Sequence, residues 1–316
     1  MTPFCKKRDQ INDSLNRTRL TKRSTFGIQA FANVWILEYK KSMKILLLGK
    51  RGMLGSEFLK LMEEQNLDFQ APTHHDLDLL DFDAVDRFLA REYFDRILYC
   101  AAYTNVEGAE TERGACERMN VDALRNLLTH KQPIIHFSTD YVFSAPDSIA
   151  IPENYPREPL NFYGESKKQS EMVLETSGVD FWNIRTSWLF GSGRENFLTK
   201  IWKASHENEI LEIVGDQIGR PTYAKDLAKF VLNHFIENKQ ESGHYHLQNS
   251  GDPVSWAGFA QYFLDKKGWK GTVKTISSDE REYKAERPKN SIFMNTKLPE
   301  GLRDWKLAVD EFMESV

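Results

Sequence analysis

The stretch Met43–Gln65, MKILLLGKRGMLGSEFLKLMEEQ, changes character twice along its length. An apolar run ends at Leu48, which is typical of a strand that is buried on both faces. Glycines follow in the pattern G-x-x-G-x-x-G, and Phe58, Leu59 and Met62 then recur at the spacing of a helix. A strand, a glycine-rich turn and a helix in this order predict a dinucleotide-binding site.

Each glycine of this turn has its own physical reason in such a site. Gly49 would permit the tight turn, Gly52 would let the backbone approach a pyrophosphate, and Gly55 would let the helix pack closely on the strand. The amide groups at the N-terminus of the helix would then face the phosphates. The turn therefore predicts cofactor binding.

The chain continues to alternate apolar runs with amphipathic stretches. Asp68–Pro72, Arg96–Ala102 and Pro133–Thr139 predict further strands, and a helix is expected from about Val106 to Leu128. This alternation indicates a parallel sheet covered by helices on both faces, with the cofactor at the carboxyl ends of the strands. The predicted fold class is α/β: a Rossmann-type doubly wound parallel sheet with a smaller C-terminal α/β substrate lobe.

The residues after the second strand bear on the choice between NADPH and NADH. An acid directly after that strand would bind the ribose hydroxyls of NAD. Here Thr73–His75 stand in that place and Asp76 comes late, while Lys50 and Arg51 add positive charge where a 2′-phosphate could lie. The pattern favours NADPH and leaves NADH open.

Two further interpretations concern the same region. His74 and His75 could bind a metal, but adjacent side chains on an extended chain point apart, which disfavours the pair as ligands. Asp78 and Leu79, within DLDLLD, stand where the adenine ring should rest. The alternative for these two residues is the N-cap of a helix.

A hydroxyl, a phenol and an amine are brought together by the predicted fold. Ser138 and Thr139 end the fourth strand, and YGESK (Tyr163–Lys167) opens the helix after the next loop. The spacing of four residues puts Tyr163 and Lys167 on one helix face. Such a pair alone is often an ordinary surface pair, but with Thr139 beside the predicted cofactor site it indicates an active site.

This triad suits the reduction of a ketone. Hydride addition leaves negative charge on the ketone oxygen, and Tyr163 could supply a proton there as the general acid. A free phenol has a pKa near ~10, and the charge of Lys167 is expected to lower it. Lys167 could also hold the nicotinamide ribose, and Thr139 could bond the ketone oxygen and fix its position.

Longer strings make the pattern more specific. CAAYTNVEGAE, MNVDALRNL, STDYVF, PLNFYGESKKQSE, IRTSWLFG, GDQIGRPTYAKDLA and RPKNSIFMNTKL follow one another in this order. With the glycine turn and the triad, they resemble the dTDP-4-dehydrorhamnose reductases of the extended short-chain dehydrogenase/reductase superfamily, from Met43 nearly to the end. The resemblance implies NADPH-dependent or NADH-dependent reduction of the C4 ketone of dTDP-4-dehydro-L-rhamnose to dTDP-L-rhamnose, a step of nucleotide-sugar and cell-surface polysaccharide biosynthesis.

The resemblance also implies roles for individual residues. The implied cofactor contacts are Gly49, Lys50, Arg51, Gly52, Met53, Leu54, Gly55, Ala101, Ala102, Tyr103, Tyr163 and Lys167. The implied catalytic residues are Thr139, Tyr163 and Lys167. The implied substrate contacts are Thr104, Asp140, Tyr141, Trp188, Arg220 and Arg287, with Arg185 and Ser187 approaching the nicotinamide end and Ser291 in the sugar-nucleotide lobe. The alternatives are core packing for Trp188, surface ion pairs for Arg220 and Arg287, and a turn for Asp140.

One loop departs from the family pattern. After STDYVF the family commonly has Asp-Gly or a similar turn, whereas Ser144-Ala145-Pro146 stands here. In the family this loop borders the substrate, so the departure bears on which sugar is bound. The alternatives are a reductase or epimerase for another nucleotide 4-keto-6-deoxy sugar, or a non-catalytic NADP-binding regulatory subunit, although the intact triad argues against the latter. The resemblance also leaves open a homodimer and a Mg²⁺ ion.

Composition narrows the class of protein. Hydrophobic residues make up 41% and charged residues 28% of the chain, as in ordinary globular proteins. A net charge of −4 and apolar runs shorter than ~20 residues give no reason to expect nucleic-acid or membrane partners. The cysteines Cys5, Cys100 and Cys116 are too scattered for a disulfide framework, so the cytoplasm is the expected location.

The first 42 residues differ from the rest. They carry nine Lys and Arg against three Asp and Glu, without the apolar core of a secretory signal. Residues 1–42 are interpreted as a dispensable extension, disordered or added by a wrongly chosen upstream start codon, with Met43 as the working start. The remainder is expected to form a cofactor-binding domain at 43–185, to which 224–238 returns, and a nucleotide-sugar domain at 186–316.

Overall fold

A computed structural model describes residues 43–147, 149–236 and 240–315. The predicted extension at 1–42 lies outside these residues, as does the end of the segment 224–238. Among the helices in the described ranges, none is long and apolar enough to cross a membrane.

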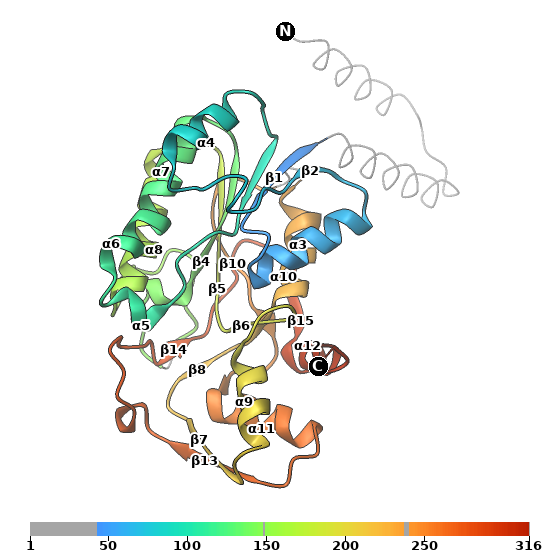
Figure 1. The fold of residues 1–316 in the computed structure, drawn as a ribbon. Coiled ribbons are helices and arrows are strands. Elements are labelled where there is room, and N and C mark those ends of the chain that lie inside the picture. The colour runs from blue at the N-terminus through green and yellow to red at the C-terminus, as the bar shows by residue number, and fades with distance from the viewer. Residues whose placement is uncertain (1–42, 148, 237–239, 316) are drawn as a thin grey trace, which may run out of the picture. The chain divides into compact units, whose positions relative to one another are not determined.

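The described part of the chain is built around a six-stranded parallel sheet (Figure 1). Its strands are β1 (Lys44–Leu48), β2 (Asp68–Gln70), β3 (Arg96–Tyr99), β4 (Ile134–Thr139), β5 (Phe181–Thr186) and β10 (Gly243–His246). They lie in the order β10-β5-β4-β3-β1-β2, and every neighbouring pair is parallel. The predicted α/β fold with a doubly wound sheet is confirmed.

The strands differ slightly from their predicted bounds. β2 ends at Gln70 because its partner β1 pairs with it only as far as Leu46. β3 ends at Tyr99, and the chain then leaves the sheet to pass against the glycine turn, with the Cys100 amide still donating to the Leu48 carbonyl. Both chain segments thus leave the sheet near the predicted cofactor site.

Helices cover both faces of the sheet (Figure 1). On one face α3 (Met53–Glu64) packs on α10 (Ala224–His234), so the chain returns to the cofactor lobe as a helix and then as strand β10. On the other face α4 (Phe82–Leu89), α7 (Ala123–Thr129) and α8 (Phe162–Thr176) pack side by side.

The long helix predicted from Val106 to Leu128 is wrong. The segment forms α5 (Val106–Ala109), α6 (Arg113–Glu117), a π-helical turn (Arg118–Asp122) and α7. The π turn carries Asn120, whose buried side chain bonds the backbone of Tyr103 and the hydroxyl of Ser166. π turns of this kind occur frequently at functional sites, and here the turn aims a polar side chain at the segment after β3.

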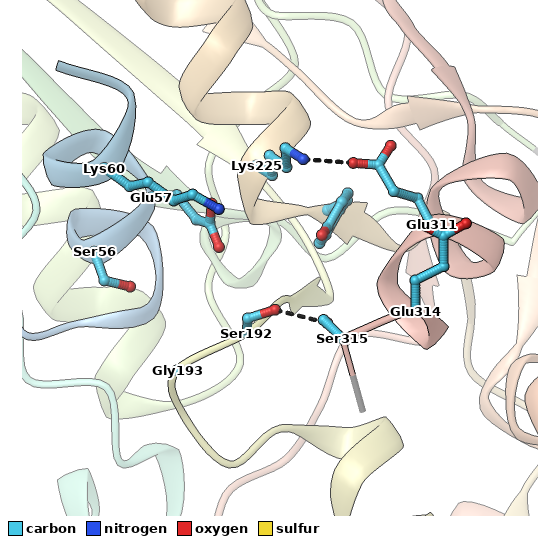
Figure 2. A pocket seen from close by; sticks show the side chains of 10 residues that line it. Ser56, Glu57, Lys60, Ser192, Gly193, Lys225, Glu311, Glu314 and Ser315 are labelled. Carbon is cyan, nitrogen blue, oxygen red and sulfur yellow. Dashed lines mark hydrogen bonds and ion pairs between the residues drawn. The ribbon is translucent and has the colours of Figure 1, made fainter. Parts of the chain in front are cut away.

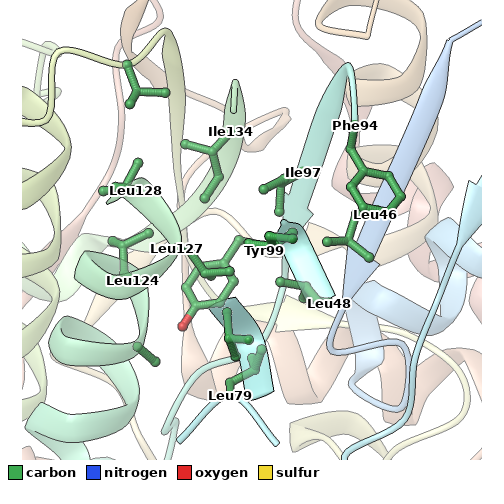
Figure 3. Close-up of a cluster of buried hydrophobic side chains, with 14 of the residues drawn as sticks. Leu46, Leu48, Leu79, Phe94, Ile97, Tyr99, Leu124, Leu127, Leu128 and Ile134 are labelled. Carbon is green, nitrogen blue, oxygen red and sulfur yellow. The ribbon is translucent and has the colours of Figure 1, made fainter. Parts of the chain in front are cut away.

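Apolar side chains between the sheet and α4, α7 and α8 form a large buried cluster (Figure 3). Leu46, Leu48 and Ile97 from the strands face Leu124 and Leu127 from α7. Fully burying a leucine contributes roughly 1.5–3 kcal/mol, so this cluster fixes the strand ends that carry the site.

The rest of the chain builds the smaller lobe. Its elements are β6 (Leu189–Phe190), α9 (Phe197–Ser205), β7 (Ile210–Val214), β8 (Ile218–Gly219), β9 (Thr222–Tyr223), β11 (Asn249–Ser250), β12 (Val254–Ser255), α11 (Trp256–Lys266), β13 (Thr272–Ile276), β14 (Asn290–Ser291), β15 (Leu302–Asp304) and α12 (Trp305–Met313). Its core contains Phe190, Phe259, Phe263, Trp305 and Phe312. This lobe meets the carboxyl ends of the sheet strands (Figure 1).

Candidate active site

The glycine turn lies directly against the end of β3. Gly49 has a φ of +92°, and a Cβ there would lie 2.6 Å from the backbone nitrogen of Ala101. A Cβ on Gly55 would lie 2.1 Å from the Gly49 carbonyl oxygen. The strand order reverses at β1, between β2 and β3, which is where open α/β sheets bind dinucleotides. The turn therefore has the backbone crowding that a pyrophosphate cradle needs.

Positive charge reaches the end of β2. The Lys50 ammonium donates a hydrogen bond to the carbonyl of Ala71, directly after that strand. Asp76 instead accepts from the amide and hydroxyl of Thr73, at 2.8 and 2.6 Å, and these bonds hold the pKa of its carboxyl below the usual value. The place where NAD-binding proteins have an acid is thus occupied by a lysine, with the nearby aspartate bonded into a turn.

Asp78 does not cap a helix. Its carboxylate accepts from the Leu80 amide, whereas Asp81 accepts from the Ala84 amide at 3.0 Å and caps α4. The N-cap alternative is therefore wrong by three residues. Leu79 is buried in the large apolar cluster, and the predicted adenine contact of both residues stays a prediction.

Thr139 and Tyr163 are brought together by the close approach of two elements. Thr139 is the last residue of β4, and Asn161 caps α8 by accepting from the Gly164 amide at 2.8 Å. A Cβ on Gly164 would lie 2.2 Å from the Tyr141 carbonyl oxygen, so the helix starts directly on the chain that follows β4. The Tyr163 ring packs edge-on against Tyr141, with centroids 5.6 Å apart.

The phenol of Tyr163 is held in its protonated form. Burial raises its pKa, the neighbouring Asp140 raises it further, and a hydrogen bond with Thr139 acts in the opposite direction. The pKa is thus raised where a lowered value was expected, and the Lys167 ammonium lies 2.9 Å from His136 Nε2. A protonated phenol is the state that a proton donor requires.

Lys167 and Asp140 are both buried, with exposed fractions of 3% and 2%. Burial lowers the pKa of Lys167 to about 8, against the charge of Glu171. Burial raises the pKa of Asp140 to about 6, although hydrogen bonds from Ser291 and Thr139 lower it. Asp140 is therefore more than a turn residue, because its carboxylate joins the end of β4 to β14 of the smaller lobe.

Trp188 and Arg220 lie where the two lobes meet. Trp188 has a φ of +48°, stacks on Trp256 with centroids 3.7 Å apart, and is only half-buried. A strained backbone conformation of this kind often marks a functional site. Arg220 donates to the carbonyls of Gly251 and Phe293, so these bonds go to the backbone.

Arg185 forms a buried ion pair. It is 2% exposed and donates to both carboxylate oxygens of Glu171, at 2.9 and 2.7 Å. The implied role near the cofactor is therefore wrong in this structure, because β5 points this side chain beneath α8. Ser187 accepts from Gln248 and donates to the Arg220 carbonyl, and Thr104 lies exposed on the loop after β3.

Arg287 lines a cavity of about 670 Å³. Its guanidinium pairs with Glu107 at 2.8 Å and stacks on Tyr283 at 3.9 Å. Lys284 and Lys289 line the same cavity, as does the loop 144–146, which differs from the family pattern. Burial raises the pKa of Tyr141, whose ring packs on Tyr163, and the charge of Arg287 opposes this rise. The cavity lining thus mixes the cations Arg281, Lys284, Arg287 and Lys289 with the acids Asp147, Asp279 and Glu286.

A second hollow, of about 340 Å³, gathers carboxylates (Figure 2). Glu57, Glu311 and Glu314 line it together with Lys60 and Lys225. The Lys225 ammonium pairs with Glu311 at 2.7 Å. Across residues 43–147, 149–236 and 240–315, no group of three or more His, Cys, Asp or Glu side chains is arranged to hold a metal ion, so the Mg²⁺ that the resemblance left open has no support.

Sequence reasoning missed the residues behind Lys167. His136 is the ring that the ammonium contacts, and Glu171 is the buried acid one helical turn beyond Lys167. Both carried a signal: a histidine inside the otherwise apolar run PIIHFST, and an acid continuing the spacing of Tyr163 and Lys167 along the same helix face.

Known proteins resemble this chain in sequence and in fold. The family described as the RmlD substrate binding domain matches residues 43–316. The dTDP-4-dehydrorhamnose reductase of Burkholderia thailandensis is 30% identical over 84% of this chain and 97% of its own, and the dTDP-4-keto-6-deoxy-D-glucose reductase of Streptomyces niveus is 29% identical over 84% and 95%. The crystal structure of dTDP-4-dehydrorhamnose reductase from Bacillus anthracis in complex with NADP has a TM-score of 0.81 at 28% identity, covering 87% of this chain and 99% of that one. The chain therefore belongs to the RmlD substrate-binding family, the family of the dTDP-4-dehydrorhamnose reductases, and it is a reductase.

Proposed function

We propose that this reductase uses NADPH to reduce the C4 ketone of dTDP-4-dehydro-L-rhamnose to dTDP-L-rhamnose. The observation that carries the proposal is the hydrogen bond between Thr139 and Tyr163, with buried Lys167 one helical turn further along α8. This group lies at the same edge of the sheet as the glycine turn, where Gly49 packs against the chain that follows β3. The similarity to reductases of dTDP-linked keto sugars supports the substrate class.

The proposed chemistry follows from the protonation states of these groups. Reduced nicotinamide, when bound, supplies a hydride to C4 of the sugar. Tyr163 donates its phenolic proton to the C4 oxygen, so the ketone becomes an alcohol and no free alkoxide accumulates. Thr139 holds the same oxygen by a hydrogen bond. The Lys167 ammonium stabilises the phenolate that remains until Tyr163 takes up a proton again.

The crowded glycine turn fits a pyrophosphate, and Lys50 favours NADPH over NADH. Lys50 lies at the end of β2, where its charge would meet the 2′-phosphate that distinguishes the two cofactors. We expect Lys50→Ala to lower the NADPH-to-NADH ratio of kcat/KM by about tenfold or more, because a charge-assisted contact contributes roughly 1.5–3 kcal/mol. Steady-state kinetics with both cofactors measure the ratio, and Lys274→Ala, which removes an exposed lysine paired with Glu212, is the matched control. An unchanged ratio contradicts the assignment.

The dTDP diphosphate is proposed to bind in the cavity lined by Arg287. A guanidinium fork suits a diphosphate better than an ammonium does. We expect Arg287→Met to raise KM for the nucleotide sugar at least about tenfold while the Kd for NADPH stays the same. Arg125→Met, which breaks an exposed pair with Asp122, serves as the control. An equal loss of affinity for both ligands would point to general disruption instead.

The direct test follows absorbance at the reduced-nicotinamide band. Purified protein is mixed with NADPH or NADH and freshly generated dTDP-4-dehydro-L-rhamnose, and the product is identified. A fall in absorbance with dTDP-L-rhamnose as product is expected. The Ser144–Pro146 loop lines the substrate cavity, so another dTDP-linked 4-keto-6-deoxy sugar is the second candidate. Cofactor binding without turnover on a panel of such sugars would favour a regulatory subunit.

A cytoplasmic location and a homodimer complete the proposal. The proposal places the cofactor and the nucleotide sugar in the cytoplasm. The cysteine content suits such a reducing compartment. Light scattering coupled to gel filtration measures the oligomeric state, and a monomer mass would remove the homodimer from the proposal.

A further inference from the structure

A chain of polar side chains runs from Lys167 through the sheet. Lys167 Nζ lies 2.9 Å from His136 Nε2, and His136 Nδ1 lies 2.6 Å from Asn183 Oδ1. Asn183 Nδ2 is 2.9 Å from His244 Nδ1, and His244 Nε2 is 2.8 Å from Glu175 Oε1. Lys167, His136 and Asn183 are each at most 3% exposed, whereas Glu175 lies at the surface.

The carboxylate of Glu171 fixes the direction of every bond in this chain. Asn183 Nδ2 donates to Glu171 Oε1 at 3.0 Å, so the amide oxygen must face His136 and accept from it. His136 therefore carries its proton on Nδ1, and its Nε2 lone pair faces Lys167. Burial and the charge of Lys167 hold the pKa of His136 well below its usual value, so the ring is neutral.

We infer that His136 is a positioning residue for this reductase, whose Nε2 lone pair accepts a hydrogen bond from the Lys167 ammonium and thereby orients the lysine behind Tyr163. An ammonium has three donors. With one held by His136, the other two are directed toward the phenol and the cofactor ribose of the proposed function, on which this inference rests. Asn183 and Glu171 act through His136, because they fix its tautomer. An amide relays protons poorly, so the chain orients Lys167 and does not conduct protons.

The groups that face Lys167 come from three elements. His136 lies on β4, Cys116 on α6, and Glu171 and Tyr163 on its own helix α8. Glu171 is already committed to Arg185 and Asn183, and the Cys116 thiol is neutral because burial raises its pKa. His136 is thus the neutral acceptor at hydrogen-bond distance from the ammonium, and its removal leaves a buried charge with one bond fewer.

Two isosteric variants separate this role from simple packing. His136→Gln places an amide oxygen near the position of Nε2 and keeps an acceptor for Lys167. His136→Asn places its amide near Nδ1, keeps a partner for Asn183 and removes the acceptor. We expect kcat to fall about 10–100-fold in His136→Asn, as misplacement of a catalytic group commonly does, and to stay within about threefold in His136→Gln. Equal losses in both variants would overturn the inference.

A measurement without cofactor or sugar keeps this test apart from the proposed function. Titration of ¹³Cε-labelled lysine by NMR, with the Lys167 signal assigned through Lys167→Arg, is expected to show a midpoint near pH 8 in the wild type. The midpoint should fall by about one pH unit in His136→Asn and change little in His136→Gln, because an ammonium without an acceptor deprotonates more readily. An unchanged midpoint in His136→Asn would overturn the inference whether or not any keto sugar is reduced.

The wild-type protein supplies a further check that needs no variant. ¹⁵N NMR of the histidine rings is expected to show His136 as the neutral Nδ1-protonated tautomer throughout the neutral pH range. A proton on His136 Nε2 would place a donor against the Lys167 ammonium and would contradict the inference. Failure of the keto-sugar assay with the expected tautomer and titration would instead count against the proposed substrate.

Discussion

Replacing Tyr163 by phenylalanine is expected to lower kcat by at least about 100-fold while the Kd for NADPH changes less than about threefold. The phenol is the proton donor of the proposed reaction, and a positioned general acid contributes typically 10²–10⁴-fold. Its pKa is raised by burial and by Asp140, so at neutral pH it carries the proton that the C4 oxygen needs. The ring itself remains, and its edge-on packing against Tyr141 is kept.

The measurement needs both turnover and binding. Stopped-flow absorbance at the reduced-nicotinamide band gives the rate of hydride transfer, and fluorescence of bound NADPH gives its Kd. Tyr155→Phe is the matched control, because that ring packs on Phe143 in a separate apolar cluster, and its kcat should match the wild type. Turnover by Tyr163→Phe at the wild-type rate would remove the phenol from the mechanism and with it the proposed role of Lys167.

The fold followed from the sequence wherever local pattern and tertiary structure agreed. The sequence correctly predicts the strand that ends at Leu48. This strand is buried on both faces, so its residues form an unbroken apolar run that is easy to recognise. The interval Val106–Leu128 was misread because its breaks depend on tertiary contacts: Asn120 turns inward to bond Tyr103 and Ser166. Helical periodicity carries no information about such a partner.

The positions of the candidate site residues could be predicted from the sequence, but their electrostatics could not. Thr139, Tyr163 and Lys167 were found from spacing, since strand ends and helix faces follow from sequence. The partner of Lys167 could not be, because His136 lies on a different element and meets the ammonium only after β4 and α8 pack together. Arg185 was misplaced for the same reason: its direction beneath α8 is set by pairing with Glu171.

Arg185→Met is expected to destabilise the protein by about 3 kcal/mol, because the buried Glu171 carboxylate loses two charged hydrogen bonds and keeps those from Arg157 and Asn183. Glu171 is fully buried and accepts hydrogen bonds from Nε and Nη2 of Arg185, at 2.9 and 2.7 Å. Arg125→Met removes one partner of an exposed pair and should cost at most about 1 kcal/mol. Urea unfolding at pH 7 compares the two variants, and equal midpoints would show that the buried pair contributes no more than a surface one.

The same variant has a pH signature that separates charge from packing. Burial alone would raise the pKa of Glu171, but the hydrogen bonds and charge of Arg185 hold it well below its usual range. A carboxyl with a depressed folded-state pKa stabilises the fold above its unfolded pKa of about 4.3, and this contribution is lost as the pH falls toward the folded-state value. The stability difference between wild type and Arg185→Met should therefore be larger at pH 7 than at about pH 3.5. Adding Glu171→Leu to Arg185→Met should recover part of the loss, because the buried carboxylate is then gone and Arg157 keeps its pair with Glu175. A difference that is constant with pH, together with additive losses in the double variant, would assign the effect to lost side-chain volume and not to the ion pair.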